Sequence, residues 1–234
     1  MFSERLIHSC ANCIVAWKNF SNLTPEEIRL VDENRYEATF KPGEIIFKQG
    51  SPATSAVFLA SGIAKIYMEG TDGKNFILGF GLPKNILIGP GAHVSNRHSY
   101  SVSALSVVQA CFLSFEILQK LMKQNPAFAL GMLEDVSSKS ITAHNKLLSL
   151  AHKKMPGRIA EALLFFSDSV FVSDVFDMLL SRQELGEMTN MAKESVVRIL
   201  KELEGSGIIR TSCSKIEILD RERLVRISEK GDSD

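Results

Sequence analysis

Two patterns of hydrophobic residues follow one another along this chain of 234 residues, and each is typical of a different kind of structure. From Tyr36 to Leu113, short runs rich in Ile, Val, Phe and Tyr alternate with turn residues, for example at 41–43, 70–73 and 89–91. Beyond Ser114 the apolar residues recur at threes and fours, which is the spacing of an amphipathic helix. We therefore expect an α+β chain in which a β-barrel or sandwich precedes a helical half.

The first half is expected to hold several short strands in a jelly-roll-like barrel. Asp72-Gly73 lies between two of them and is a strong hairpin signal. Ahead of the barrel, Thr24 followed by Pro25 marks the start of a helix. The expected strands are 44–48, 56–60, 63–68, 75–80, 85–88, 99–105 and 107–113.

The second half opens with a short helix at 115–122 and then a long one at 126–154. A helix of roughly 25 residues spans about 37 Å, and its apolar stripe favours packing against the same helix of a second copy. Met155-Pro156-Gly157 is expected to stop the long helix and to act as a hinge, with a new helix at 158–166.

A helix–turn–helix pattern occupies residues 178–210. A short strand is expected at 178–180, after which Ser181 and Glu184 match a capping box at the start of a helix. A tight turn at 189–191 leads into a second helix at about 192–204, which ends at a glycine-rich C-cap. Helices in this arrangement place the second helix in the major groove of DNA.

The second helix has two chemically different faces. At about 100° per residue, Val196, Ile199, Leu200 and Leu203 fall on one side. Arginine can bond guanine, glutamate can accept from cytosine and valine can touch a thymine methyl, so the other side suits base recognition. That side holds Lys193, Glu194, Val197, Arg198 and Lys201.

Two apolar segments around a polar turn at 208–219 predict a β-hairpin wing after the second helix. Polar side chains of such a wing can contact phosphates, which position a protein on DNA without specifying a sequence. The candidates are Arg210, Thr211, Ser212, Ser214 and Lys215.

Charge gives no general support for DNA binding. The chain has 27 Lys+Arg and 27 Asp+Glu, and residues 155–234 alone carry 11 basic and 15 acidic residues, a net charge of −4. The basic residues instead gather locally in the helix–turn–helix and the wing. Neutral overall charge predicts weak non-specific binding and greater dependence on base contacts.

Composition and the N-terminal segment indicate an ordinary globular protein. Hydrophobic residues make up 45% of the chain, which excludes global disorder. We expect no signal peptide and no membrane-spanning segment. Four cysteines do not make a disulfide scaffold, so a cytoplasmic protein with reduced thiols is expected.

The sequence resembles the cyclic-AMP receptor / fumarate-nitrate reductase regulator (CRP/FNR) family over nearly its whole length. Residues 41–50, 58–67 and 72–74 resemble the first strands and hairpins of the family's barrel. Residues 181–186 and 193–204 are close to the family's recognition motif.

This resemblance implies a β-roll sensor domain at 1–125, a dimerisation helix at 126–154 and a winged helix–turn–helix DNA-binding domain at 155–234. It implies a signal-gated transcription regulator that binds a two-fold symmetric site on double-stranded DNA as a homodimer, with RNA polymerase as a partner if it is an activator. The residues that it assigns to DNA are Arg182, Gln183, Lys193, Glu194, Ser195, Val197, Arg198 and Lys201.

Within that set, Glu194 and Arg198 match the base-reading Glu and Arg of the family. Lys193 stands where cyclic-AMP receptors carry Arg, and Val197 where members often have Gly or Ser. The half-site is therefore expected to depart from the usual family sequence.

The sequence does not identify the signal that the β-roll senses, and it argues against cyclic AMP. Pro90 replaces the Glu that meets the ribose in cyclic-AMP binders, and the phosphate-binding Arg position falls on His98, one residue from Arg97. A phosphate there loses its bidentate partner. A different anion could bind at Gly89, Arg97, His98, Ser99 and Tyr100.

Two cofactors are alternative signals, each of which would make the chain a redox, oxygen or nitric-oxide sensor. Cys10, Cys13 and Cys111 resemble three of the four cluster ligands of fumarate-nitrate-type regulators, while Asn19 stands near the place of the missing one. The cysteine pair could instead hold a metal or serve a redox role. Haem with His93 and His98 as axial ligands is the other alternative.

No catalytic pattern points to an enzyme. The chain has no Ser-His-Asp order, no Gly-rich phosphate loop and no HExxH motif. A regulatory module that binds an effector but not DNA is the nearer alternative, and the helix–turn–helix and wing argue against it.

Overall fold

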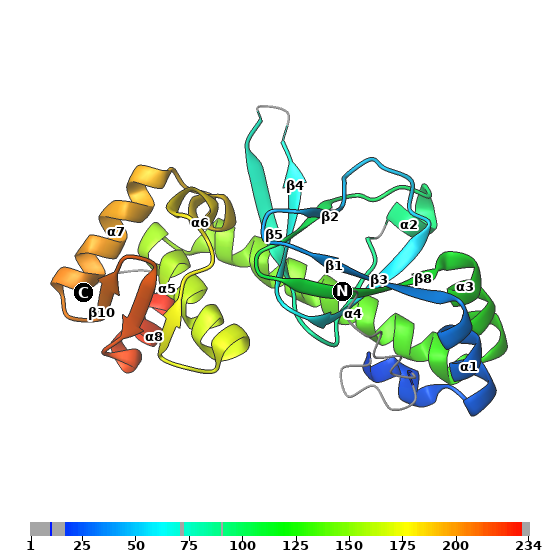
Figure 1. The fold of residues 1–234 in the computed structure, drawn as a ribbon. Helices are drawn as coiled ribbons and strands as arrows, with labels where there is room; N and C mark the ends of the chain where they lie inside the picture. The colour runs from blue at the N-terminus through cyan, green and yellow to red at the C-terminus, as the bar shows by residue number, and fades with distance from the viewer. Residues whose placement is uncertain (1–9, 11–16, 71–72, 90, 231–234) are drawn as a thin grey trace, which may run out of the picture. The chain divides into compact units, whose positions relative to one another are not determined.

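The computed structural model of the protein describes residues 10, 17–70, 73–89 and 91–230 (Figure 1). It forms two compact units. The first contains residues up to Met68 together with Phe80–Lys139, and the second contains Glu69–Gly79 and the chain from Ser140 onward. The division falls within the long helix α4 (Pro126–His152). None of the helices in these described ranges has the length and apolar character that crossing a membrane requires.

Two four-stranded sheets form a β-roll. One has the order β1-β8-β3-β6 and the other the order β2-β7-β4-β5. The strand bounds are β1 (Arg35–Phe40), β2 (Ile45–Phe47), β3 (Ser55–Ser61), β4 (Ala64–Glu69), β5 (Asn75–Gly81), β6 (Ile86–Leu87), β7 (Ser101–Ala104) and β8 (Val108–Ser114).

The seven strands expected from the sequence are all present, and the sequence pattern missed β1. Only part of β1 is apolar, and none of its residues is fully buried. The strand is held by pairing with β8, in a register that runs from Arg35 opposite Leu113 to Phe40 opposite Val108. Such pairing joins residues far apart in sequence, so local periodicity carries little sign of it.

Strand β3 separates two apolar cores, because successive side chains of a strand point to opposite faces. Val57 and Leu59 pack in the core between the sheets. Ala56 and Phe58 pack in a second core together with the helices. Burial on both faces explains why β3 reads as a nearly continuous apolar run.

The second core is covered by η2 (Lys18–Asn22), α1 (Pro25–Glu33), α3 (Phe115–Gln124) and the start of α4. The expected helix start at Thr24 is confirmed, because Thr24 and Glu27 form a reciprocal capping box. Asn19 donates from Nδ2 to the carbonyl of Phe128 at 2.8 Å and is buried. A Cβ at Gly131 would lie 2.0 Å from Asn19 Oδ1, so glycine permits this approach. A four-residue helix, α2 (Gly91–Val94), follows β6.

The second unit contains a helix–turn–helix and a three-stranded sheet of order β10-β11-β9 (Figure 1). Its helices bury apolar residues such as Ile159, Leu163 and Leu224. The elements are α5 (Met155–Phe165), η3 (Phe166–Phe171), β9 (Val175–Asp177), α6 (Arg182–Thr189), α7 (Lys193–Gly205), β10 (Ile209–Ser212), β11 (Lys215–Ile218) and α8 (Arg221–Lys230).

Two local expectations were wrong. The strand predicted at 178–180 is β9 at Val175–Asp177, three residues earlier, where Phe176 pairs with Ile216 of the wing and is buried. The break after α4 falls at 153–154, and Met155-Pro156-Gly157 form the first turn of α5. Proline is tolerated there because the first turn has no intrahelical partner for its missing N–H.

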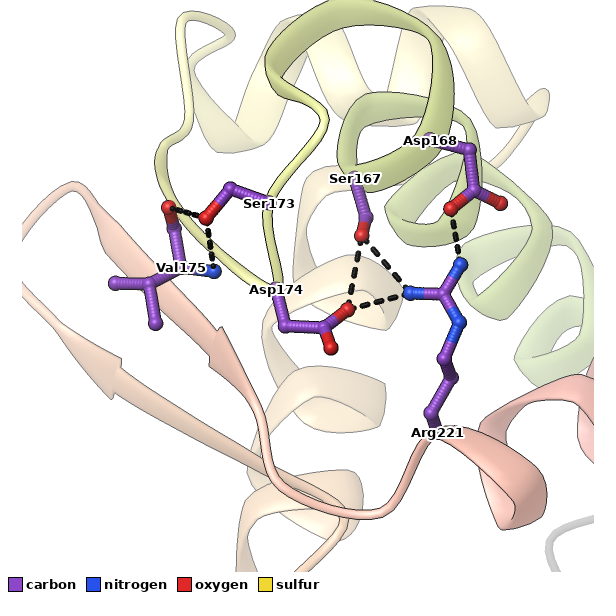
Figure 2. A network of polar contacts seen from close by, with 6 residues as sticks. All are labelled: Ser167, Asp168, Ser173, Asp174, Val175 and Arg221. Atoms are coloured by element: carbon purple, nitrogen blue, oxygen red, sulfur yellow. Dashed lines mark hydrogen bonds and ion pairs between the residues drawn. The ribbon is translucent and has the colours of Figure 1, made fainter.

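The C-terminal helix α8 begins at Arg221, which is held by a polar network (Figure 2). Arg221 pairs with both Asp168 and Asp174 and donates from Nη1 to Ser167 Oγ at 3.0 Å. Ser167 Oγ donates to Asp174 Oδ1 at 3.1 Å. The network ties α8 to the start of η3 and to the loop before β9.

Candidate nucleic-acid interface

The turn between α6 and α7 is fixed by local chemistry. Ser181 Oγ accepts from the Glu184 N–H at 3.2 Å, and Glu184 Oε2 accepts from the Ser181 N–H at 2.9 Å, which completes the expected capping box. Asn190 ends α6 in the left-handed conformation with φ 52°. A Cβ on Gly186 would lie 2.6 Å from the Met191 carbonyl oxygen, so glycine is required for the turn to close over α6.

Helix α7 has the two faces that its periodicity predicted. Val196, Ile199, Leu200 and Leu203 are at most 4% exposed and form its inner face. The opposite side chains line a single hollow on the surface of this unit, and they are those expected from the helical wheel: Lys193, Glu194, Val197, Arg198 and Lys201.

The remaining residues assigned to DNA lie in the first turns of the two helices. Ser195 is half-buried in the first turn of α7. Gln183 is exposed on α6, where its amide donates to Glu187 Oε1 at 3.5 Å. Arg182 is partly buried, and this desolvation lowers its pKa while the nearby Glu204 acts in the opposite direction.

The wing is connected to α7 through Glu204. Its carboxylate accepts from the Thr211 N–H at 2.8 Å and from Thr211 Oγ1 at 2.9 Å. These hydrogen bonds, with a smaller contribution from Arg182, hold the pKa of Glu204 below its ordinary value. Arg210 of the wing pairs with Glu217 at 2.7 Å, and the exposed Cys213 makes the turn with φ 54°.

Three hydrogen-bond acceptors that lie close to arginine or wing residues of this unit were not predicted from the sequence. Glu202 pairs with Arg198 at 2.6 Å between Oε1 and Nη1. Glu204 joins the wing to α7, and the Asn190 carbonyl accepts from Arg158 Nη1 at 3.4 Å. The i,i+4 spacing of Arg198 and Glu202 could have predicted their ion pair from the sequence. The other two contacts join different elements, so no local spacing indicates them.

The anion site expected in the β-roll is only partly assembled. An ideal Cβ on Gly89 would lie 3.1 Å from Ser99 Oγ and 3.5 Å from the Tyr100 ring, so these three residues do come together. Arg97 instead donates from Nη1 to the Gly50 carbonyl at 2.6 Å. His98 is buried with its ring stacked on Phe47 at 4.0 Å between centroids, and burial lowers its pKa.

The structure brings Cys10 and Cys111 to one cavity of about 30 Å³, which has room for about two water molecules. The Cys10 N–H donates to Asp32 Oδ1 at 2.9 Å, and Arg35 Nη1 lies 3.8 Å from Cys111 Sγ. Burial, with a hydrogen bond to Asp32, raises the pKa of Cys10 to about 12. The thiol of the metal-free chain is therefore protonated near neutral pH.

Within the described residues, two of the expected cluster ligands, Cys10 and Cys111, meet at this cavity. A cluster takes four thiolates, and within the described ranges no three His, Cys, Asp or Glu side chains are grouped to hold a metal ion. Cys13 lies outside the described residues. Asn19 is buried and bonded to Phe128, as set out above. For haem, the ring of His93 packs edge-to-face on Phe115, at 5.5 Å between centroids.

Two family models match this chain, one in each half. The model described as "Cyclic nucleotide-binding domain" matches residues 37–125. The model described as "Crp-like helix-turn-helix domain" matches residues 157–227, which include α6, α7 and the wing.

Curated relatives and solved structures resemble the chain over most of its length. It is 28% identical to the transcriptional activator protein Anr of Pseudomonas aeruginosa, over 88% of this chain and 86% of that protein. It is 24% identical to the nitrogen fixation regulation protein FixK of Bradyrhizobium diazoefficiens, over 93% and 92% of the two chains. The structure of FixK2 from Bradyrhizobium japonicum shares the fold, with a TM-score of 0.75 at 22% identity over 82% of this chain and 96% of that one. With its β-roll, long helix and winged helix–turn–helix, the chain belongs to the CRP/FNR family of transcription regulators.

Proposed function

We propose that the chain reads a two-fold symmetric DNA site as a homodimer, with α7 in the major groove of each half-site. The outward face of α7 is the observation that carries this proposal. Its five side chains line one surface hollow, while the apolar side of the same helix is buried. A helix built this way can present hydrogen-bonding groups to base edges without disturbing its own packing.

We assign direct base recognition to Arg198, Glu194 and Val197. Arg198 suits guanine O6 and N7, Glu194 suits the amino group of cytosine, and Val197 suits a thymine methyl. The assigned positioning residues, which would meet phosphates, are Arg182, Gln183, Lys193, Ser195 and Lys201, together with the wing.

The homodimer is proposed to form through α4. This helix carries large apolar side chains that are more than half exposed in the single chain, which is unusual for a soluble helix. Their recurrence along the helix suits packing against the same helix of a second copy. They are Leu130, Leu133, Val136, Ile141, Leu147 and Leu148.

We further propose that a signal in the β-roll gates DNA binding through α4, and that the chain regulates transcription rather than catalysing a reaction. Because a regulator of this kind acts on the chromosome, we place it in the cytoplasm. Relatives such as Anr of Pseudomonas aeruginosa are transcriptional activators, which favours RNA polymerase as a further partner.

Base recognition is tested by selecting DNA sites from a random duplex library and then titrating the selected site. Arg198→Ala is expected to weaken discrimination at one base pair of each half-site by about 1–3 kcal/mol. Arg226→Ala removes the same charge from the exposed part of α8 and is the matched control. Unchanged discrimination in Arg198→Ala would contradict the assignment.

Dimerisation is tested by light scattering on the purified full chain. Leu133→Lys is expected to produce monomers, because it places a charge within the apolar stripe of α4. Glu134→Lys introduces the same side chain one residue further, about 100° around the helix, and should leave the dimer intact. A dimer that persists in Leu133→Lys would show that α4 is not the interface.

A further inference from the structure

Carboxylates accompany the arginines that surround the candidate DNA surface. Arg198 pairs with Glu202 at 2.6 Å on α7, and Arg210 pairs with Glu217 at 2.7 Å on the wing. Both pairs lie on the surface, so salt and water weaken them. They add little to the stability of the fold, and their presence beside DNA-facing arginines needs another explanation.

The pair on α7 differs from the wing pair in what its arginine is placed to do. Arg198 lines the surface hollow of α7 with Glu194 and Lys201, whereas Arg210 belongs to a hairpin whose polar residues suit phosphates. Arg198 and Glu202 are four residues apart and therefore lie on neighbouring positions of the same helical face. The side chains are 55% and 45% exposed, so each remains accessible to a ligand.

The geometry of the pair leaves part of the guanidinium available. Glu202 Oε1 accepts from Nη1 of Arg198. A guanidinium has five N–H donors in a fixed plane, so the edge with Nη2 and Nε can still make two parallel hydrogen bonds. Guanine O6 and N7 accept such a bidentate pair.

We propose that Glu202 is a positioning residue for base recognition: it holds the Arg198 guanidinium so that its remaining edge meets guanine. This inference rests on the proposed function of α7. An arginine side chain held in place before binding loses less conformational freedom on binding, which favours the complex. The carboxylate also opposes contacts between Arg198 and phosphates, so Glu202 increases the preference for the correct base over random DNA.

The test uses the full-length protein and the DNA site selected as described above. Discrimination is measured as a ratio of two Kd values. The numerator is the Kd for a site in which the guanine contacted by Arg198 is replaced, and the denominator is the Kd for the selected site. Glu202→Ala removes both the charge and the acceptor, and it is expected to reduce this ratio about three- to ten-fold. Glu202→Gln removes the charge but keeps an acceptor oxygen, and it is expected to retain most of the wild-type discrimination ratio.

Two controls separate positioning from charge. Glu217→Ala removes a carboxylate from the Arg210 pair, so it should tighten binding to random duplex DNA as Glu202→Ala does, with an unchanged discrimination ratio. In an Arg198→Ala background, Glu202→Ala should cause no further loss of discrimination, because Glu202 acts through Arg198. Thermal unfolding of each variant checks that the exposed substitutions leave the fold intact.

The outcomes distinguish this inference from the function on which it rests. If Arg198→Ala loses discrimination while Glu202→Ala keeps it, Glu202 has no positioning role and the inference is overturned. Equal loss in Glu202→Ala and Glu202→Gln would also overturn it, because charge alone would then explain the effect. If the wild-type protein selects no sequence, or if Arg198→Ala changes nothing, the proposed function itself fails.

Discussion

The outer face of α7 and the β-roll segment at 97–100 are both polar, but their polar atoms have different surroundings. On α7, the guanidinium of Arg198 is accessible and its partner Glu202 is exposed as well. In the β-roll, His98 Nδ1 and Ser99 Oγ are buried with no hydrogen-bond partner among the described atoms. The comparison shows that a helix face can display polar groups at little cost, whereas the segment between α2 and β7 buries some of its own.

Because of this difference, substitutions in the two regions should change different properties of the protein. A change on the outer face of α7 removes few packing contacts, so its effect should appear in DNA binding. A change at His98 alters a ring that stacks on Phe47, so its effect should appear in stability. The experiments below test that separation.

The largest effect is expected from the inner face of α7. Ile199 is 1% exposed, and Ile199→Ala should lower the free energy of unfolding by about 2–5 kcal/mol, because it leaves a cavity in the core. Lys201→Ala, on the exposed face, should leave stability nearly unchanged and weaken DNA binding at low salt. Urea denaturation of both variants measures the free energy of unfolding, and a salt titration of DNA binding measures the affinity. Similar losses of stability would remove the distinction between the two faces.

A strong effect is also expected in thiol chemistry, which extends the comparison to a half-buried and an exposed cysteine. The thiol of Cys10 has a pKa raised to about 12 by burial, whereas Cys213 is exposed in the wing. Since the thiolate is the reactive form, iodoacetamide at pH 8 should label Cys10 at least about 100-fold more slowly than Cys213. Peptide mass spectrometry gives both rates, and denaturant should bring them together. Equal rates in the folded protein would show that Cys10 is accessible.

A smaller, pH-dependent effect is expected at His98. Burial holds its pKa in the folded chain below 6.5, so the unfolded chain binds the proton more tightly. Its contribution to stability is complete above about pH 6.5 and is lost as the pH falls from there through the folded pKa. His98→Phe keeps an aromatic ring against Phe47, and it should lose less stability than the wild type between pH 7.5 and 5.5. Urea denaturation at both values measures this, and equal losses would show that His98 does not titrate in this way.

The smallest effect is expected at Val172, which ends η3 with φ 50° and ψ 47°. A β-branched residue in this conformation is strained, and its side chain is 84% exposed, so little packing depends on it. Val172→Gly should gain about 0.5 kcal/mol, because relief of strain exceeds the added freedom of the unfolded chain. Val175→Gly, in the extended strand β9, should lose stability instead. Thermal unfolding compares the two variants, and a loss of stability in both would show that Val172 is not strained.

Much of the fold was predictable because the relevant forces act between near neighbours. The capping boxes at Thr24 and Ser181 and the two faces of α7 depend on residues within a few positions of one another, and the structure confirms them. Strand β1 was missed because its partner β8 lies more than 60 residues away along the chain. The displaced strand at 178–180 has the same cause, since β9 is fixed by its register with the wing.

The sequence alone determined the architecture of two different halves, the helix–turn–helix with its wing, and the side chains that α7 turns outward. Periodicity, caps and turn residues suffice for these features because they are local. Only the tertiary structure decided that Cys10 and Cys111 share a small cavity, that Arg97 bonds the Gly50 carbonyl and that His98 is buried against Phe47. These contacts join distant segments, and burial changes the chemistry of the groups involved in a way that no local pattern records.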